Sequence, residues 1–489
     1  MTVISRKLLL TLGAVVLVGG GVSAWILHGN PSDRPIEQME GRKPTLVDPE
    51  PETIPSVSLM KTVGWAAGEA PAAAKGLTVT RFAEGLSHPR TMLTLPNGDV
   101  LVSETGAPKG NDPGGVTGFV QRHLIGFVGG GDVSPNRIVL LRDSKGTGSA
   151  DQRFVLREAG LSSPSGLAYA NGKLYVANHD AVLAFDYQPG ATALTGDPKK
   201  IMDLPGGGNH WMRNLVLSPD GKKLYVAVGS ASNIGERGMK AEQGRAAIFE
   251  IDVASGSHRQ YAAGMRNTNG MGWNPSTDEL WAVVNERDQL GPDLVPDYLT
   301  NVPVGAHYGW PWVYWGKIVD ERVDIQMPDY LTDYSRKPEY ALGPHVAPLG
   351  MAFANGGGRL GDHYANGAFI ARHGSWNRRP AVGYDVVFVR FDANGNPQGL
   401  PEPVLTGFLT GKGDTHGRPA WVGFAKDGAL LVSDDTAGVI WRVIAPGAGP
   451  AAAPKAVVAD HMQPQRELTS DPEMQYRIKF KADEKVREQ

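Results

Sequence analysis

Residues 210–229 read HWMRNLVLSPDGKKLYVAVG, and this stretch decides the fold. An apolar run is followed by Pro-Asp-Gly and then by a second apolar run. Asp-Gly between two apolar runs is a strong β-hairpin signal, because both residues tolerate the positive φ angles of a tight turn. The stretch therefore predicts two antiparallel strands joined by a short turn.

The same pattern recurs along the chain. Its copies lie at residues 86–104, 161–177, 210–229, 266–284, 346–353 and 418–433. Further strand-like segments follow at residues 137–141, 182–186, 247–252, 386–392 and 439–443. Six hairpins with added outer strands predict an all-β protein, a six-bladed β-propeller of four-stranded blades. A pair of β-sandwiches is the alternative, and the Gly-His…Trp-Asp signature of WD40 propellers is absent from the sequence.

Composition agrees with a turn-rich β-protein and excludes several functions. The 489 residues include 63 Gly and no Cys, and the net charge is −3. A near-neutral chain gives no electrostatic reason to expect nucleic-acid binding. Without cysteine there is no thiolate metal site, no cysteine nucleophile and no Cys-x-x-Cys-His haem attachment.

The two ends of the chain differ from the repeats. Arg6 and Lys7 precede an uncharged run over residues 8–27, which is long enough to span the ~30 Å core of a bilayer. We expect residues 1–28 to be a signal peptide or a transmembrane anchor, with the bulk of the chain exported to the periplasm and anchored to the inner membrane by residues 8–27. Residues 29–75 then form a linker or arm, 76–445 the propeller and 446–489 a tail.

Polar residues precede the first strand of each hairpin. In a propeller these positions meet at one mouth of the central channel, although they are far apart in sequence. Several cations around one pocket suit a compact polyanionic ligand. The residues concerned are His88, Arg90, His210, Arg213, Arg266, Asn267, His345, His416 and Arg418.

Several motifs resemble the soluble PQQ-dependent glucose/sorbosone dehydrogenase family, most closely its L-sorbosone dehydrogenase branch. They are GGNHW at residues 207–211, MRNTNGM at 265–271, HYGWP at 307–311, GSWNR at 374–378 and DTAG at 435–438. The resemblance covers roughly residues 78–445. It implies a quinoprotein that binds pyrroloquinoline quinone (PQQ) and Ca²⁺.

The resemblance also implies roles for individual residues. His210 matches the family's general base, which takes the hydroxyl proton of the substrate while hydride moves to the quinone. Arg266 matches the arginine beside the reactive carbonyl, and Asn267 matches a neighbouring cofactor ligand. Arg418 matches the first of two arginines that bind the carboxylates of the cofactor. Arg378, with Arg379 as the next candidate, is the expected substitute for a cofactor-binding lysine of the family.

Two departures from the family pattern affect the site. The second carboxylate-binding arginine falls at Ala420, so that contact is lost or supplied elsewhere. The aspartate behind the base in the glucose dehydrogenases has no counterpart in the VGSAS stretch of residues 228–232. We therefore expect Ser230 or another group to orient His210.

The family's calcium is expected in the loop after residues 285–286. Calcium prefers six to eight oxygen ligands, including backbone carbonyls. The carbonyls of Arg287 and Asp288 are one candidate pair, and those of Gly291 and Pro292 are the other. Alternatively, Asp288 and Asp293 only cap turns.

The resulting expectation is an exported dehydrogenase that oxidises a sugar, a sugar alcohol or a hydrated aldehyde such as sorbosone. Its electrons would pass to an external acceptor, either a quinone such as ubiquinone or a soluble carrier, with membrane contact through the N-terminal segment. A calcium-dependent hydrolase of the lactonase type and a non-catalytic binding propeller are the alternatives. A lactonase would need channel-facing carboxylates from several blades, whereas the positions before the strands carry Arg, Asn and His.

Overall fold

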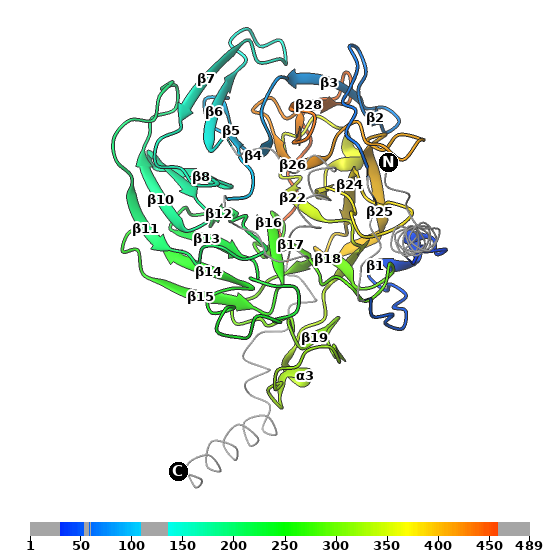
Figure 1. Ribbon diagram of the computed structural model, residues 1–489. Helices are drawn as coiled ribbons and strands as arrows, with labels where there is room; N and C mark the ends of the chain where they lie inside the picture. Colours follow the sequence, from blue (N-terminus) through cyan, green and yellow to red (C-terminus); the bar gives the residue numbers. More distant parts are fainter. Residues whose placement is uncertain (1–29, 53–57, 59, 109–134, 458–489) are drawn as a thin grey trace, which may run out of the picture.

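The computed structural model describes residues 30–52, 58, 60–108 and 135–457. Six antiparallel sheets are arranged around a central axis, each built on four strands (Figure 1). The innermost strands of neighbouring sheets contact one another around that axis. The six-bladed β-propeller predicted from the repeats is therefore confirmed.

The first three blades follow the chain without interruption in strand order, from the inner strand outward. Blade 1 contains β4 (Pro89–Thr94), β5 (Val100–Glu104), β6 (Arg137–Arg142) and β7 (Gln152–Arg157). Blade 2 contains β8 (Gly166–Ala170), β9 (Lys173–Ala177), β10 (Ala181–Asp186) and β11 (Lys199–Asp203). Blade 3 contains β12 (Leu215–Leu217), β13 (Lys223–Val228), β14 (Ala247–Asp252) and β15 (His258–Ala263).

The other three blades receive strands from distant parts of the chain. Blade 4 contains β16 (Asn267–Trp273), β17 (Leu280–Asn285), β18 (Pro296–Asn301), β21 (Tyr340–Pro344) and the added β1 (Glu40–Gly41). Blade 5 contains β22 (Pro348–Phe353), β23 (Gly367–Arg372), β24 (Asp385–Phe391), β25 (Pro397–Thr406) and the added β2 (Ala72–Ala73). Blade 6 contains β26 (Pro419–Phe424), β27 (Leu430–Asp434), β28 (Val439–Ile444) and β3 (Thr78–Ala83).

The core lies between the blades. Middle strands are covered on both faces by neighbouring blades, so they are apolar almost throughout rather than alternating. In β9 and β13 every residue after the first is buried. Apolar clusters accordingly join adjacent blades, as where Val176 of blade 2 packs with Leu167 and with Leu140 of blade 1.

The ring is closed by a strand from the N-terminal side. β3 pairs antiparallel with β28, so that Thr78 lies opposite Ile444 and Ala83 opposite Ile440. The first strand of the domain thereby completes the last blade. Such closure leaves no open edge between the first and last blades.

Trp441 of β28 anchors this closure. Its ring is fully buried, lies 5.3 Å from the Trp65 ring and has the Arg81 guanidinium 5.5 Å from its centre.

We expect Trp441→Ala to lower the free energy of unfolding by about 3–5 kcal/mol, because removal of a large aromatic side chain would leave a cavity. Urea denaturation measures the change. Val155→Ala, at a residue that is 48% exposed on β7, should change stability by no more than about 0.5 kcal/mol. Equal effects of the two substitutions would contradict the anchoring role.

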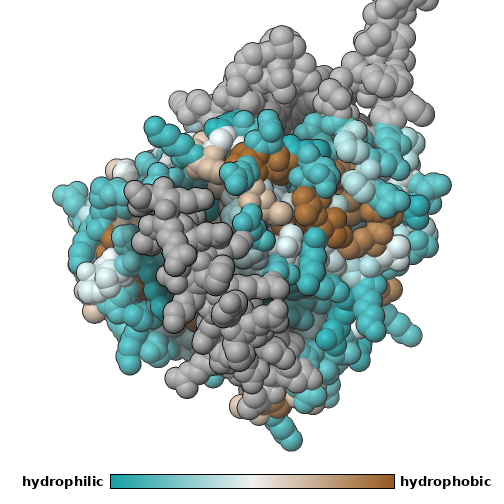
Figure 2. Space-filling view, turned by 90° about the horizontal axis from the view of Figure 1, so that it is seen from below, coloured by the Kyte–Doolittle hydropathy of each residue, from teal (hydrophilic) through white to brown (hydrophobic). Residues whose placement is uncertain are grey.

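An excursion between β18 and β21 projects from the body at the bottom of Figure 1. It carries the hairpin of β19 (Val313–Tyr314) and β20 (Ile318–Val319) and the short helix α3 (Leu331–Tyr334). Tyr330, at the start of α3, is 62% exposed. Figure 2 views the molecule from this side; outside the grey residues the visible surface is mostly hydrophilic, and apolar residues gather in its upper and right part.

The N-terminal arm packs on the propeller through β1, β2 and the 3-10 helix η1 (Ile36–Met39), which contacts β21 of blade 4. A second 3-10 helix, η2 (Asp362–Tyr364), lies between β22 and β23. The predicted membrane segment at residues 8–27 lies outside the described residues. In the described part of the chain, no helix is long and apolar enough to cross a membrane.

Candidate active site

The strand topology explains why distant polar residues meet. Each inner strand starts where the second strand of its blade ends, as shown by the opposed pairs Asn267 and Asn285, Pro348 and Arg372, and Pro419 and Asp434. Residues just before an inner strand and just after a second strand therefore gather at one mouth of the channel. All the site residues predicted from the sequence belong to these two kinds of position or to the loops that continue from them.

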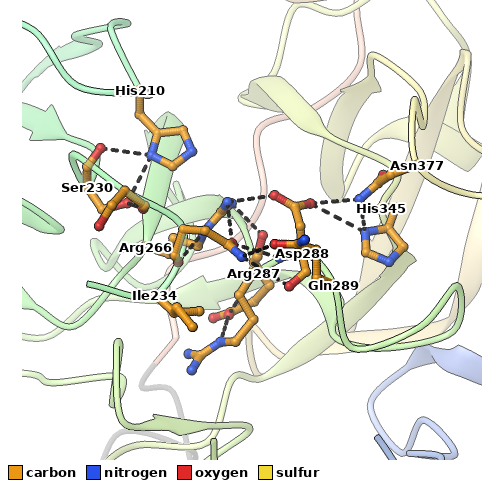
Figure 3. A network of polar contacts seen from close by, with 12 residues as sticks. His210, Ser230, Ile234, Arg266, Arg287, Asp288, Gln289, His345 and Asn377 are labelled. Carbon is orange, nitrogen blue, oxygen red and sulfur yellow. Dashed lines mark hydrogen bonds and ion pairs between the residues drawn. The ribbon is translucent and has the colours of Figure 1, made fainter. Parts of the chain in front are cut away.

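His210 lies just before β12 and faces the end of β13. Its Nδ1 is 2.9 Å from the carbonyl oxygen of Ser230 and 2.9 Å from the Ser230 hydroxyl (Figure 3). The hydroxyl donates its own hydrogen to the carbonyl of Ser232 at 2.7 Å. Both Ser230 oxygens thus accept from the imidazole, so Nδ1 carries the proton and Nε2 carries the free lone pair. The contact with Ser230 confirms the expected orienting partner.

The surroundings of His210 keep its ring neutral. Burial, followed by the positive charge of Arg266, lowers the pKa of His210 well below its ordinary value, against the opposing effect of the Ser230 carbonyl. A neutral ring with Nδ1 protonated can accept a proton at Nε2. His210 nevertheless retains partial exposure to solvent.

This lowered pKa predicts the pH dependence of any reaction that uses His210 as a base. The neutral form persists as pH falls through 6.5, so the rate of cofactor reduction should stay level there and fall only at more acidic pH. A pH–rate profile of single-turnover reduction measures this. An acidic limb with a midpoint at or above 6.5 would contradict the assignment.

Two buried arginines hold the loop that carries His210. Arg213 is fully buried and donates to the carbonyls of His210, Met212 and Pro205, at 2.8–2.9 Å. Arg245 donates to the carbonyls of Pro205, Gly206 and Gly207 at 2.6–3.0 Å. The expectation that Arg213 is a channel-facing cation is therefore wrong, because loop carbonyls bind its guanidinium inside the protein.

Arg266 and Asn267 lie beside His210, across Gly229. A Cβ on Gly229 would come within 2.6 Å of both Asn267 Oδ1 and His210 Cβ, so only glycine allows this approach. Among the described residues, the Asn267 side-chain amide has no hydrogen-bonding partner. His210 and Asn267 therefore present unused polar groups side by side.

The guanidinium of Arg266 is fixed by four acceptors. It donates to the Asn233 carbonyl at 3.1 Å, to Asn233 Oδ1 at 2.9 Å, to the Glu286 carbonyl and to Asp288 at 2.8 Å. Asp288 also accepts from Asn377 at 2.8 Å (Figure 3). Arg266 is thus a rigid, buried cation whose charge acts on His210.

The other two predicted cofactor arginines differ from each other. Arg378 is 2% exposed, forms an ion pair with Asp293 at 2.9 Å and donates to the Pro292 carbonyl at 3.0 Å. Arg418 is half-buried and donates through Nε and Nη2 to the carbonyls of His373 and Gly374. Its Nη1 has no hydrogen-bonding partner in the described part of the chain. Only Arg418 therefore has a nitrogen free for a ligand.

In the first pair of predicted calcium ligands, the oxygens of Asp288 already accept hydrogen bonds. The Asp288 carbonyl accepts from the Arg322 guanidinium at 2.9 Å, and its carboxylate binds Arg266 and Asn377. Donor groups thus occupy the Asp288 oxygens that a cation would need.

The carbonyls of the second predicted pair, Gly291 and Pro292, are also in contact with side-chain nitrogens. The Gly291 carbonyl lies 3.1 Å from Nε2 of His345. Nδ1 of the same ring lies against the Asn377 side-chain amide. The Pro292 carbonyl accepts from Arg378. Side chains from distant segments thus lie on the carbonyls of Asp288, Gly291 and Pro292, so a calcium ion would have to share or displace these contacts.

A polar cluster of His373, Asp435 and Arg90 lies across the channel from His210, and the sequence did not predict that these residues come together. His373 follows β23 and Asp435 follows β27, and the His373 ring lies 3.0 Å from both Asp435 oxygens. Arg90 of β4 pairs with the same carboxylate. His373 and Asp435 each directly follow the second strand of their blade. That position in the sequence pattern could have identified them as residues of the channel mouth. His416, by contrast, stacks on Trp65 at 4.6 Å, outside this cluster.

Comparison with known proteins identifies the family of this chain. The TrAA12-like family model matches residues 133–301 and 327–445, which is more than half of the chain. The chain therefore belongs to the TrAA12-like family.

Two relatives carry names that describe an activity. A pyrroloquinoline quinone-dependent sugar dehydrogenase of Hypocrea jecorina is 24% identical over 76% of this chain and 89% of its own length. A pyrroloquinoline quinone-dependent pyranose dehydrogenase of Coprinopsis cinerea is 24% identical over 76% of this chain. The chain spans 54% of that relative's length.

Among solved structures, the calcium structure of the Trichoderma reesei carbohydrate-active enzyme of family AA12 superposes with a TM-score of 0.62 at 21% identity. It covers 79% of this chain and 98% of its own. At this identity the likeness establishes the propeller fold alone.

Proposed function

We propose that this protein is a PQQ-dependent dehydrogenase that oxidises a sugar, a sugar alcohol or a hydrated aldehyde such as sorbosone. The observation that carries the proposal is the imidazole of His210. Its Nδ1 is fixed on Ser230 and its Nε2 is free, beside Arg266 and Asn267. The names of the two relatives support PQQ as the cofactor and a sugar as the substrate class.

The donor set fits an acidic quinone. Arg418 offers one free nitrogen of its guanidinium, Asn267 offers an unused amide, and Arg266 supplies a fixed positive charge. Such donors bind carboxylate and carbonyl oxygens well. When bound, PQQ would supply the acceptor for a hydride from the substrate.

Residues of the chain itself accept the proton of the substrate and stabilise the charges that develop. His210 Nε2 accepts the hydrogen of the substrate hydroxyl as the C–H bond breaks. The imidazolium that results keeps its Nδ1 hydrogen on the two Ser230 oxygens, which stabilise the added charge. Arg266 stabilises negative charge that develops on the acceptor oxygen, because its position is fixed before the reaction.

We propose that electrons then pass from the site to an external acceptor; the given sequence contains no Cys-x-x-Cys-His motif for covalent haem. A membrane quinone such as ubiquinone or a soluble carrier fits this requirement. We propose an exported location with residues 8–27 as the inner-membrane anchor. The apolar character of that segment in the sequence supports this part of the proposal.

A lactonase-type hydrolase is less well supported. It would need metal-binding carboxylates converging in the channel. Within the described ranges, no group of three or more His, Cys, Asp or Glu residues is placed to hold a metal ion. The carboxylates of Asp288 and Asp435 at the channel mouth are instead paired with Arg266 and Arg90.

The test is reconstitution of the purified apoprotein. PQQ is added with and without Ca²⁺, and dye reduction is followed with a panel of aldoses, sugar alcohols and aldehydes. PQQ-dependent dye reduction with at least one such substrate is expected. Lactone hydrolysis without PQQ, or absence of both activities, would overturn the proposal. Calcium is included because a relative's structure contains it, and no residue of the loop at 287–292 is assigned to it.

A further inference from the structure

The side of the channel opposite His210 contains a second arginine that the resemblance did not assign. Arg90 of β4 reaches across the blade boundary and pairs through Nη1 with Asp435 of blade 6. Its Nε lies 3.4 Å from the sulfur of Met212, and its guanidinium lies 5.8 Å from the ring of Trp211. Trp211 and Met212 directly follow His210, so Arg90 connects the His210 side of the mouth with the Asp435 side.

The position at which the family has its second carboxylate-binding arginine is apolar here. Ala420 is 1% exposed and packs with Met212 and Leu349 in a small cluster from three blades. β26 therefore supplies one cation to the channel, from Arg418, and not two. A ligand with more than one carboxylate needs another positive partner from elsewhere.

Arg90 and Arg418 flank the same buried pair of side chains. Burial opposes ionisation of Asp435, but His373 and the two guanidinium groups keep its pKa well below the usual range. Burial, followed by the charge of Arg418, lowers the pKa of His373 to about 3, so this ring is neutral. Two guanidinium groups thus act on the single carboxylate of Asp435.

Both guanidinium groups also keep an unused nitrogen. Among the described residues, neither Nη2 of Arg90 nor Nη1 of Arg418 has a hydrogen-bonding partner. The Arg90 side chain is 16% exposed. Asp435 and His373 both contact Nη1 of Arg90, and Met212 lies against its Nε, so the guanidinium is held while Nη2 stays unused.

We propose that Arg90 is the second carboxylate-binding arginine of the cofactor site and supplies from blade 1 the contact that is missing at Ala420. Asp435 acts as a positioning residue that holds Arg90 in place. This inference rests on the proposed function, because the ligand is the acidic quinone.

The test is a titration of apoprotein with PQQ, followed by absorbance or protein fluorescence. Arg90→Met should weaken PQQ binding by about 10- to 100-fold, the range expected for losing a hydrogen bond between charged groups. Arg90→Lys should lose less, because it keeps the charge without the planar fork. Arg153→Met, on the outer strand of the same blade, is the matched control and should bind as the parent does.

Two further measurements separate a direct contact from an indirect effect. The trimethyl ester of PQQ should bind equally to the parent protein and to Arg90→Met, because it lacks the carboxylates. Arg90→Met combined with Asp435→Asn leaves no buried carboxylate unpaired, and it should bind PQQ as weakly as Arg90→Met. Parent-like PQQ binding by this double variant, or by Arg90→Met, would overturn the role of Arg90. Failure of the parent protein to bind PQQ would instead overturn the proposed function.

Discussion

Replacing His210 with alanine is expected to slow reduction of bound PQQ by about 10²–10⁴-fold, the usual cost of removing a general base. The imidazole is the group at the channel mouth whose Nε2 is left as an acceptor by the Ser230 contacts. PQQ affinity should change little, since the expected carboxylate contacts come from arginines on the other side. Stopped-flow absorbance under single-turnover conditions separates the two quantities.

His258→Ala is a suitable control because His258 is an exposed histidine of β15, on the outer edge of blade 3. It should leave both the rate and the affinity unchanged. A His210→Ala variant that binds PQQ and reduces it at the parent rate would remove the base assignment. The propeller fold would be unaffected by that result.

Replacing Arg266 with methionine should lower kcat by about 10²–10³-fold, as expected when one preorganised donor to a developing oxyanion is lost. The loss should be large because Asn233, Glu286 and Asp288 hold the guanidinium in place before the substrate arrives. Arg266→Lys should recover only part of the rate. Its ammonium group cannot reproduce all four contacts of the guanidinium.

Arg259→Met provides the comparison for Arg266, since the Arg259 side chain is 61% exposed and pairs with Glu250 on the outer strands of blade 3. Melting temperatures of both variants show whether the fold is retained. Steady-state kinetics at saturating PQQ then give kcat. An Arg266→Met enzyme that stays folded and keeps the parent kcat would contradict the role in catalysis.

The blades could be predicted because their signals are local. Asp-Gly and Asn-Gly turns identify the inner hairpins, and the outer strands at 137–142, 247–252 and 439–444 begin within a residue of the predicted positions. The pairing of β3 with β28 was not predicted, because its partners lie at opposite ends of the domain. The excursion between β18 and β21 was also not predicted, since its short strands lack a repeating pattern.

The site was predicted in part. The turn before β12 and the hydroxyl after β13 correctly indicated that His210 contacts Ser230. Sequence position alone could not show which arginines face the channel, because a guanidinium can equally well bind backbone carbonyls inside the protein. Arg213 and Arg378 do so here. The donors that cap the carbonyls of the 287–292 loop come from distant segments, so they too left no local signal.

The seam between β3 and β28 affects how this domain can be made. Blade 6 lacks its outer strand until residues 78–83 meet a strand that is synthesised near the end of the chain. Residues 78–83 therefore stay unpaired with β28 until that strand has been synthesised. Unpaired strand edges of this kind make folding chains prone to aggregate. A chaperone that shields this short segment would protect a pairing that local folding cannot complete.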